Sequence, residues 1–68
     1  MGSVARVTEI SCRSDQSFED AVRAGVDRAN KTLRNVKSAW IKEQRVDVDE
    51  GRIVGYQVNL LVTFVLDD

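Results

Sequence analysis

The sequence predicts an α+β domain with the element order β-α-β-β, in which a three-stranded antiparallel sheet carries one helix on one face. Three observations predict this. Apolar residues recur at every second position over residues 55–66, as in a strand with one buried face. An apolar stripe at steps of three and four over residues 17–35 is typical of an amphipathic helix. Residues 49–51 read Asp-Glu-Gly, a hairpin turn that joins the last two strands.

Residues 55–66 carry the clearest strand pattern in the chain. Every even position is apolar, with Tyr56, Val58, Leu60, Val62, Phe64 and Leu66 in order. The odd positions begin polar with Gln57 and Asn59 but include Leu61 and Val65. A face meant only for water would not carry these two apolar residues, so we expect something else to cover it.

The length of this strand points to self-association. Twelve residues extend roughly 40 Å at 3.3 Å each, whereas a compact domain of this size has a diameter of about 28 Å. The strand should therefore reach beyond its own monomer and lie over a neighbouring copy.

The helix is expected to begin after Ser17, whose hydroxyl can accept a hydrogen bond from the amide of Asp20. It should run to about Asn35. Its predicted apolar stripe consists of Phe18, Val22, Val26, Ala29, Leu33 and Val36. Glu19, Arg23, Asp27 and Lys31 step by four with alternating charge and should form a solvated face. Gly25 costs helix stability, so it should permit close approach of a strand or a neighbour.

The remaining strands are expected at residues 4–12 and 38–48. The first has β-branched content but poor alternation. In the second, Ser38 and Trp40 share one face with Gln44, while Arg45 lies on the other. The third strand has the cleanest pattern and should be central, with the helix crossing between the two outer strands.

Composition limits the classes of protein. The chain has 68 residues, predicts one domain, and should bury only about 60% of its unfolded surface. Folds of this size usually need disulfides, metal or oligomerisation. With one cysteine, Cys12, and no histidine, the chain can form neither an internal disulfide nor a Cys/His zinc site, so self-association remains as the means of stabilisation. A net charge of −1 gives no nucleic-acid footprint. With no signal-peptide core and no membrane-length run, a cytoplasmic protein is the default.

Catalytic motifs are almost absent, so an enzyme is not expected: there is no histidine base, no glycine-rich phosphate loop and no nucleophile paired with a base. Cys12 is either a reactive thiol or a small structural cysteine, and we favour the second. The acid pairs at positions 49–50 and 67–68 could hold a hard cation, although a solvated turn and a charged tail are commoner interpretations.

The sheet face away from the helix is the candidate binding surface. Gln57 can donate and accept at once, which suits an amide-like ring edge, or it pairs with a neighbouring subunit. Trp40 can stack on an aromatic ligand or pack in a subunit contact; the pattern alone favours the contact. The second strand contributes either Trp40 with Gln44 or Arg45, according to which face looks outward.

The chain resembles the dodecin family over nearly its whole length. The resemblance is carried by Ser-Phe-Glu-Asp-Ala at the helix start, Lys-Thr-Leu-Arg-Asn at its end and Tyr-Gln-Val in the last strand, in order and spacing. It implies hollow twelve-subunit shells, built as trimers joined at two-fold contacts. Many dodecins bind flavin pairs at those contacts, stacked between tryptophans, and store or buffer flavin without acting as flavoenzymes.

The resemblance implies particular site residues. The family glutamine that hydrogen-bonds the isoalloxazine ring falls on Gln57, and an arginine associated with the flavin mononucleotide phosphate falls on Arg45. The stacking tryptophan falls on Ser38, with Trp40 two residues further on, about 7 Å away along the strand. A second basic position near the end of the last strand reads Val65. Here the sequence departs from the family pattern at two positions.

Two functions follow from these expectations. The first is a homododecameric store that binds flavin mononucleotide or riboflavin through Gln57 and Arg45, with Trp40 stacking if it reaches the two-fold pocket. The second is a structural shell without flavin, in which Trp40 packs between subunits and calcium or another small ligand binds elsewhere. Flavin is ranked slightly ahead, although for Trp40 itself we favour the structural role.

Overall fold

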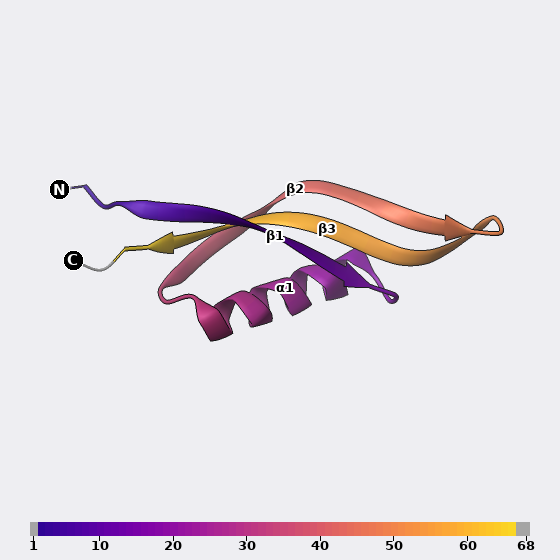
Figure 1. The fold of residues 1–68 in the computed structure, drawn as a ribbon, viewed down its shortest axis with the longest axis horizontal. Coiled ribbons are helices and arrows are strands. Elements are labelled where there is room, and N and C mark those ends of the chain that lie inside the picture. Colours follow the sequence, from indigo (N-terminus) through magenta and orange to yellow (C-terminus); the bar gives the residue numbers. More distant parts are fainter. Residues whose placement is uncertain (1, 67–68) are drawn as a thin grey trace.

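A computed structural model describes residues 2–66 and confirms the β-α-β-β order. The elements are β1 (Ala5–Ser14), α1 (Phe18–Thr32), β2 (Val36–Asp49) and β3 (Arg52–Val65). The strand order is β1-β3-β2 with both pairs antiparallel, so the predicted central position of the last strand is confirmed. The helix lies along one face of this sheet (Figure 1).

The start of α1 was predicted correctly, but its end was not. The Ser17 hydroxyl accepts a hydrogen bond from the backbone N–H of Asp20 at 3.0 Å, as expected for an N-cap. The helix ends at Thr32, where Leu33 is extended and its N–H closes the last turn on the Ala29 carbonyl. Asn35 then takes a left-handed conformation with φ 62°, and the chain turns into β2. The predicted extension of the helix to Asn35 is therefore wrong.

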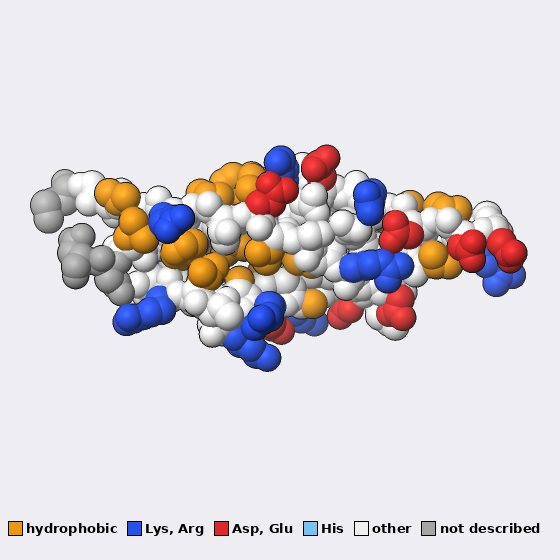
Figure 2. Space-filling view, viewed as in Figure 1, with side chains coloured by type: hydrophobic (Ala, Val, Ile, Leu, Met, Phe, Trp, Pro, Cys, Tyr) orange, Lys and Arg blue, Asp and Glu red, His pale blue; other side chains and the backbone are white. Residues whose placement is uncertain are grey.

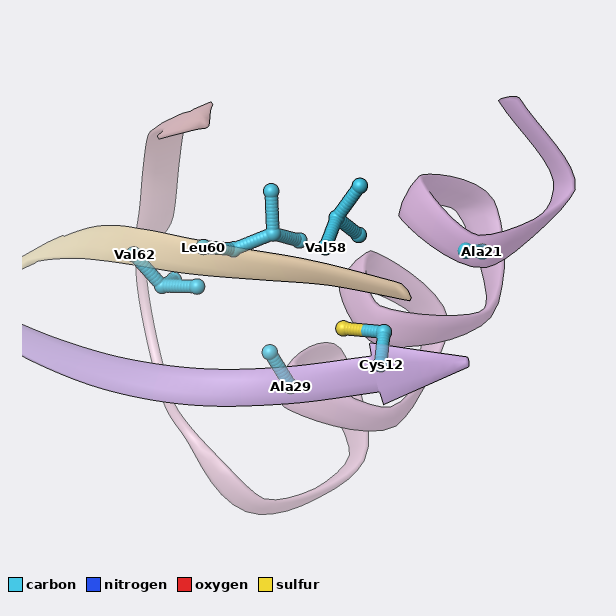
Figure 3. Close-up of a cluster of buried hydrophobic side chains, with 6 residues drawn as sticks. All are labelled: Cys12, Ala21, Ala29, Val58, Leu60 and Val62. Carbon is cyan, nitrogen blue, oxygen red and sulfur yellow. The ribbon is translucent and has the colours of Figure 1, made fainter. Parts of the chain in front are cut away.

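The core is small and is built around short side chains on the helix. The buried apolar residues are Cys12, Ala21, Ala29, Val58, Leu60 and Val62, which meet between sheet and helix in Figure 3. The face of the helix that is buried therefore differs from the predicted apolar stripe. The large residues of that stripe are only partly buried at the margin of the helix–sheet contact, and Val36 belongs to β2. Small residues at the centre of the contact let the helix backbone lie close to the sheet. Larger side chains there would hold the helix and the sheet further apart.

Gly25 marks the closest approach of helix and sheet, as its position predicted. A Cβ placed on Gly25 would overlap the Cys12 sulfur and lie 3.1 Å from Cδ1 of Leu60. Cys12 is buried, and burial raises the pKa of its thiol above the ordinary value of 9.0. A protonated thiol facing a helix is a packing group, which agrees with the structural role expected for it.

The β2–β3 hairpin extends well beyond the helix (Figure 1). The molecule measures 53 × 19 × 13 Å with a radius of gyration of 14.1 Å, against about 11 Å for a compact chain of this length. This confirms the expectation that the last strand is longer than a compact domain of this size is wide. At the tip, Glu50 and Gly51 both have positive φ, 49° and 76°, which is the type I′ turn that hairpins favour.

Within residues 2–66, no helix combines the length and the apolar character that crossing a bilayer requires.

Candidate ligand site on the open face of the sheet

The sheet face away from α1, called the open face below, is organised in rows. Directly paired residues of antiparallel strands lie on the same face. The register therefore places four rows across β1, β3 and β2 on the open face: Arg13–Gln57–Arg45, Ser11–Asn59–Glu43, Glu9–Leu61–Trp40 and Val7–Thr63–Ser38.

A β-bulge in β2 brings Trp40 and Arg45 onto the same face. Ile41 pairs with Leu60 and Glu43 with Asn59, so Lys42 is an extra residue opposite the β3 ladder. The strict alternation assumed from the sequence places Trp40 and Arg45 on opposite faces, and it is wrong for this reason. Gln44 instead pairs with buried Val58 and lies on the helix side of the sheet.

Gln57 is held in one orientation by its neighbours on both sides. Nη2 of Arg45 donates to Oε1 of Gln57 at 3.0 Å, and Nε2 of Gln57 donates to Oγ of Ser11 at 2.9 Å. Because a guanidinium group only donates, it fixes the amide oxygen toward β2 and the nitrogen toward β1. The amide keeps one N–H and one lone pair for a further partner.

Asp47 links the two arginines that flank Gln57. Its Oδ2 accepts from Nε of Arg13 at 3.0 Å, and its Oδ1 lies 3.8 Å from Nε of Arg45. The guanidinium of Arg13 lies against Gly55, where a Cβ would overlap it. Exposed ion pairs of this kind add only about 0–1 kcal/mol of stability, so their main effect is to position the arginines. Sequence reasoning missed Arg13, which the β1–β3 register places opposite Gln57.

A hollow of about 100 Å³ lies beside Gln57 and is lined by Glu43, Gln44, Arg45, Gln57 and Asn59. Nδ2 of Asn59 donates to Oε1 of Glu43 over a long 3.4 Å, while Oδ1 of Asn59 is buried and has no hydrogen-bond partner. The site therefore holds one incompletely paired polar group, in the row next to Gln57.

The aromatic part of the site lies further along the sheet. Trp40 is 48% exposed and stands opposite Leu61, four positions from Gln57 on β3, or about 13 Å at 3.3 Å per residue. Ser38 is exposed one row beyond, opposite Thr63. The structure thus brings Gln57 and Arg45 together, but it leaves Trp40 and Ser38 at a distance within one protomer.

The open face changes character along its length. Figure 2, a view down the shortest axis of the molecule, shows most hydrophobic side chains toward the start of β1 and the end of β3 and a few near the hairpin tip, whereas acidic side chains lie from the middle toward that tip. Nζ of Lys42, the bulge residue, donates to Oε1 of Glu9 in the third row at 3.1 Å, so this ion pair joins β2 to β1 across β3. Two polar rows therefore adjoin two rows of mixed character near Leu61.

A second, larger groove of about 480 Å³ runs between β1 and α1 on the helix side. Its wall is largely apolar, with Arg13 and Arg28 among the lining residues and Cys12 within it. The raised pKa of the Cys12 thiol keeps the sulfur protonated at neutral pH, so this groove contains no activated nucleophile.

The acid pairs give little support for a metal site. No group of three or more cysteine, histidine or acidic side chains gathers anywhere in the described residues 2–66. Asp49 and Glu50 are exposed at the hairpin tip. Asp67 and Asp68, the second predicted pair, lie outside the described residues.

Comparisons with known proteins agree on one family. The family model described as Dodecin matches residues 4–67. A curated dodecin of Thermus thermophilus is 37% identical over 68 residues, which cover 100% of this chain and 99% of the relative.

Solved structures show the same fold. Dodecin from Streptomyces davaonensis superposes with a TM-score of 0.91 at 34% identity, over 100% of both chains. A Mycobacterium tuberculosis protein described as a calcium dodecin with a novel calcium-binding site gives 0.81 at 33% identity, over 96% of this chain and 93% of that one. Dodecins are small ligand-binding dodecamers and not enzymes, in agreement with the missing catalytic motifs. Matched in sequence along its length and in the arrangement of every strand and the helix, this chain belongs to the dodecin family.

Proposed function

We propose that this chain forms a closed homododecamer built from trimers and binds a flavin at contacts between its subunits, as a flavin store or buffer. The observation that carries the ligand class is the pair Gln57 and Arg45, joined at 3.0 Å on the open face. Family membership supports the assembly. The cytoplasmic location stays a prediction from the sequence.

The shape of the protomer supports assembly. The hairpin outreaches the helix, and Val48 and Ile53 near its tip are 61% and 54% exposed. The buried core is small for 65 described residues, so repeated interfaces would supply the remaining stability. Light scattering at micromolar concentration should give a mass near twelve times 7.6 kDa, or about 91 kDa. A stable monomer or dimer would contradict the proposal.

The polar row fits the edge of a flavin ring. The free N–H and lone pair of Gln57 match the alternating donors and acceptors of the pyrimidine edge. Arg45 has further N–H groups beyond its bond to Gln57 and can pair with a phosphate. Trp40 lies about 13 Å along the strand from Gln57, so a partner protomer would most simply supply the stacking ring. This arrangement supports a site shared between two subunits.

Titration with riboflavin and with flavin mononucleotide tests the ligand. The protein should quench flavin fluorescence at saturation. Gln57→Leu should weaken binding by about tenfold, since it removes a donor and an acceptor from the ring edge. Gln16→Leu is the matched control, because Gln16 is an exposed glutamine in the turn before α1 and does not line the hollow. Flavin that stays fully fluorescent with excess protein would leave the structural shell as the better function.

Trp40 separates these two functions. If it stacks on the ligand, Trp40→Ala should abolish quenching at an unchanged mass, with an affinity loss of about 1–3 kcal/mol. If it packs against another subunit, truncation should loosen the assembly at a cost of roughly 3–5 kcal/mol. The half-exposed ring of the free protomer is compatible with either cover. Because Trp40 lies two residues from the family's stacking position at Ser38, we favour packing of its ring between subunits. If Trp40→Ala kept the shell intact but lost flavin binding, that preference would be wrong.

Calcium is the lower-ranked ligand. It is supported by the exposed acids Asp49 and Glu50 and by the description of the Mycobacterium tuberculosis relative. Metal analysis of the purified protein tests it, and calcium bound in a fixed ratio to subunits would raise its rank.

A further inference from the structure

We infer that Asn59 is a second ligand-reading residue beside Gln57, and that its Oδ1 accepts a hydrogen bond from the imide N–H of the flavin ring edge. This inference rests on the proposed flavin-binding function. It adds a residue that neither the sequence motifs nor the resemblance assigned to the site.

The inference begins with an acceptor that has no donor. Oδ1 of Asn59 is buried and unpaired, although buried polar atoms in folded proteins are nearly always hydrogen-bonded. Turning the amide around would not solve this, because its oxygen would then face the carboxylate of Glu43, another acceptor. The orientation with nitrogen toward Glu43 and oxygen unpaired is therefore the better one available to the protomer alone.

Its position places this acceptor within the candidate site. Asn59 lies in the row between the Gln57 row and the row of Leu61 and Trp40. It lines the hollow of about 100 Å³ that Gln57 and Arg45 also line. Successive rows on one strand face are about 7 Å apart. Asn59 therefore lies one row from Gln57, within reach of the same ring edge, whichever protomer supplies the stacking ring.

The side chains around Asn59 can move to admit a ligand. Glu43 and Arg45 are both exposed, and the bond from Asn59 to Glu43 is long at 3.4 Å. A ligand that displaces their ends exchanges an unpaired acceptor for a paired one, which strengthens binding because the protomer alone leaves that acceptor unmatched.

The flavin edge has the matching chemistry. Its pyrimidine ring presents an imide N–H between two carbonyl oxygens. Oδ1 of Asn59 accepts the N–H, while the remaining N–H of Gln57 donates to an adjacent carbonyl. Two amides on consecutive rows thus read neighbouring groups, and a ring without the imide N–H should bind less well.

The test uses the full assembled protein with riboflavin and N3-methylriboflavin, which lacks the imide N–H. Asn59→Val should weaken riboflavin binding about five- to tenfold, the usual effect of one neutral hydrogen bond. It should not lower the unfolding midpoint, because valine suits a strand and removes an unpaired group. Thr63→Val, which also removes one polar group from the open face of β3, is the matched control and should leave affinity unchanged.

The methylated ligand isolates the contact. N3-methylriboflavin should bind the unaltered protein more weakly than riboflavin does, and Asn59→Val should reduce that preference. If Asn59→Val binds riboflavin as the unaltered protein does, the inference is wrong while the proposed function stands. A lower unfolding midpoint with unchanged affinity would assign Asn59 a structural role and also overturn it. If the unaltered protein binds neither flavin, the proposed function fails and the inference fails with it.

Discussion

The contact between Gly25 and Cys12 gives the sharpest prediction about stability. Alanine normally favours a helix over glycine by about 1 kcal/mol. Here the added Cβ would overlap the Cys12 sulfur and approach Leu60 at 3.1 Å, so the helix must move off the sheet. Overpacking of this kind costs up to about 3 kcal/mol. The net effect expected for Gly25→Ala is therefore a loss of about 2 kcal/mol, measured by urea unfolding at one fixed subunit concentration.

Two further variants test the cause. In a Cys12→Ala background the sulfur is gone, so Gly25→Ala should become neutral or stabilising, with a coupling of about 3 kcal/mol between the two sites. Gly55→Ala is the matched control: its Cβ would overlap the guanidinium of Arg13, but that side chain is 50% exposed and can swing away. We expect it to change stability by less than about 1 kcal/mol. Equal losses from Gly25→Ala in both backgrounds would refute the reasoning.

Two other predictions concern the turn and the thiol. Glu50 adopts φ 49°, which asparagine tolerates better, so Glu50→Asn should raise the free energy of unfolding by about 0.5–1 kcal/mol in the same assay; a loss would mean that its side chain contributes more than its backbone costs. Burial raises the pKa of the Cys12 thiol, so the unfolded chain releases this proton more readily than the folded one. The free energy of unfolding should therefore fall as the pH rises above 9.0, more steeply than in Cys12→Ala, and equal slopes would contradict the pKa shift.

The parts of the fold that follow from short-range chemistry were predictable. The Ser17 cap, the Asp-Glu-Gly turn and the alternating pattern of β3 each depend on neighbouring residues, and each is present in the structure. The end of α1 was not predictable in this way. Leu33 continues the apolar periodicity, yet the helix stops at Thr32 because the following segment joins the sheet instead. A tertiary strand pairing here outweighs a local helical pattern.

Which residues form the open face could not be predicted from the sequence, for a different reason. One extra residue, Lys42, reverses the orientation of the β2 residues that follow it as far as Asp47, and no local signal marks a bulge of this kind. Sequence reasoning therefore placed Trp40 and Arg45 on opposite faces. It also had no means to place Arg13 opposite Gln57, because that contact depends on the register between β1 and β3.

The polar pairing on the open face bears directly on what covers it. Gln57 of the first row is already hydrogen-bonded to Arg45 and to Ser11 of the second row, so another subunit could cover it and leave only one N–H and one lone pair to be matched. Asn59 differs, because an apolar cover would leave its Oδ1 permanently without a partner. A purely structural shell would be more stable with an apolar residue at this position. A cover that carries an N–H donor would remove the conflict, and under the proposed function the edge of a flavin ring would supply that donor beside the adjoining hollow.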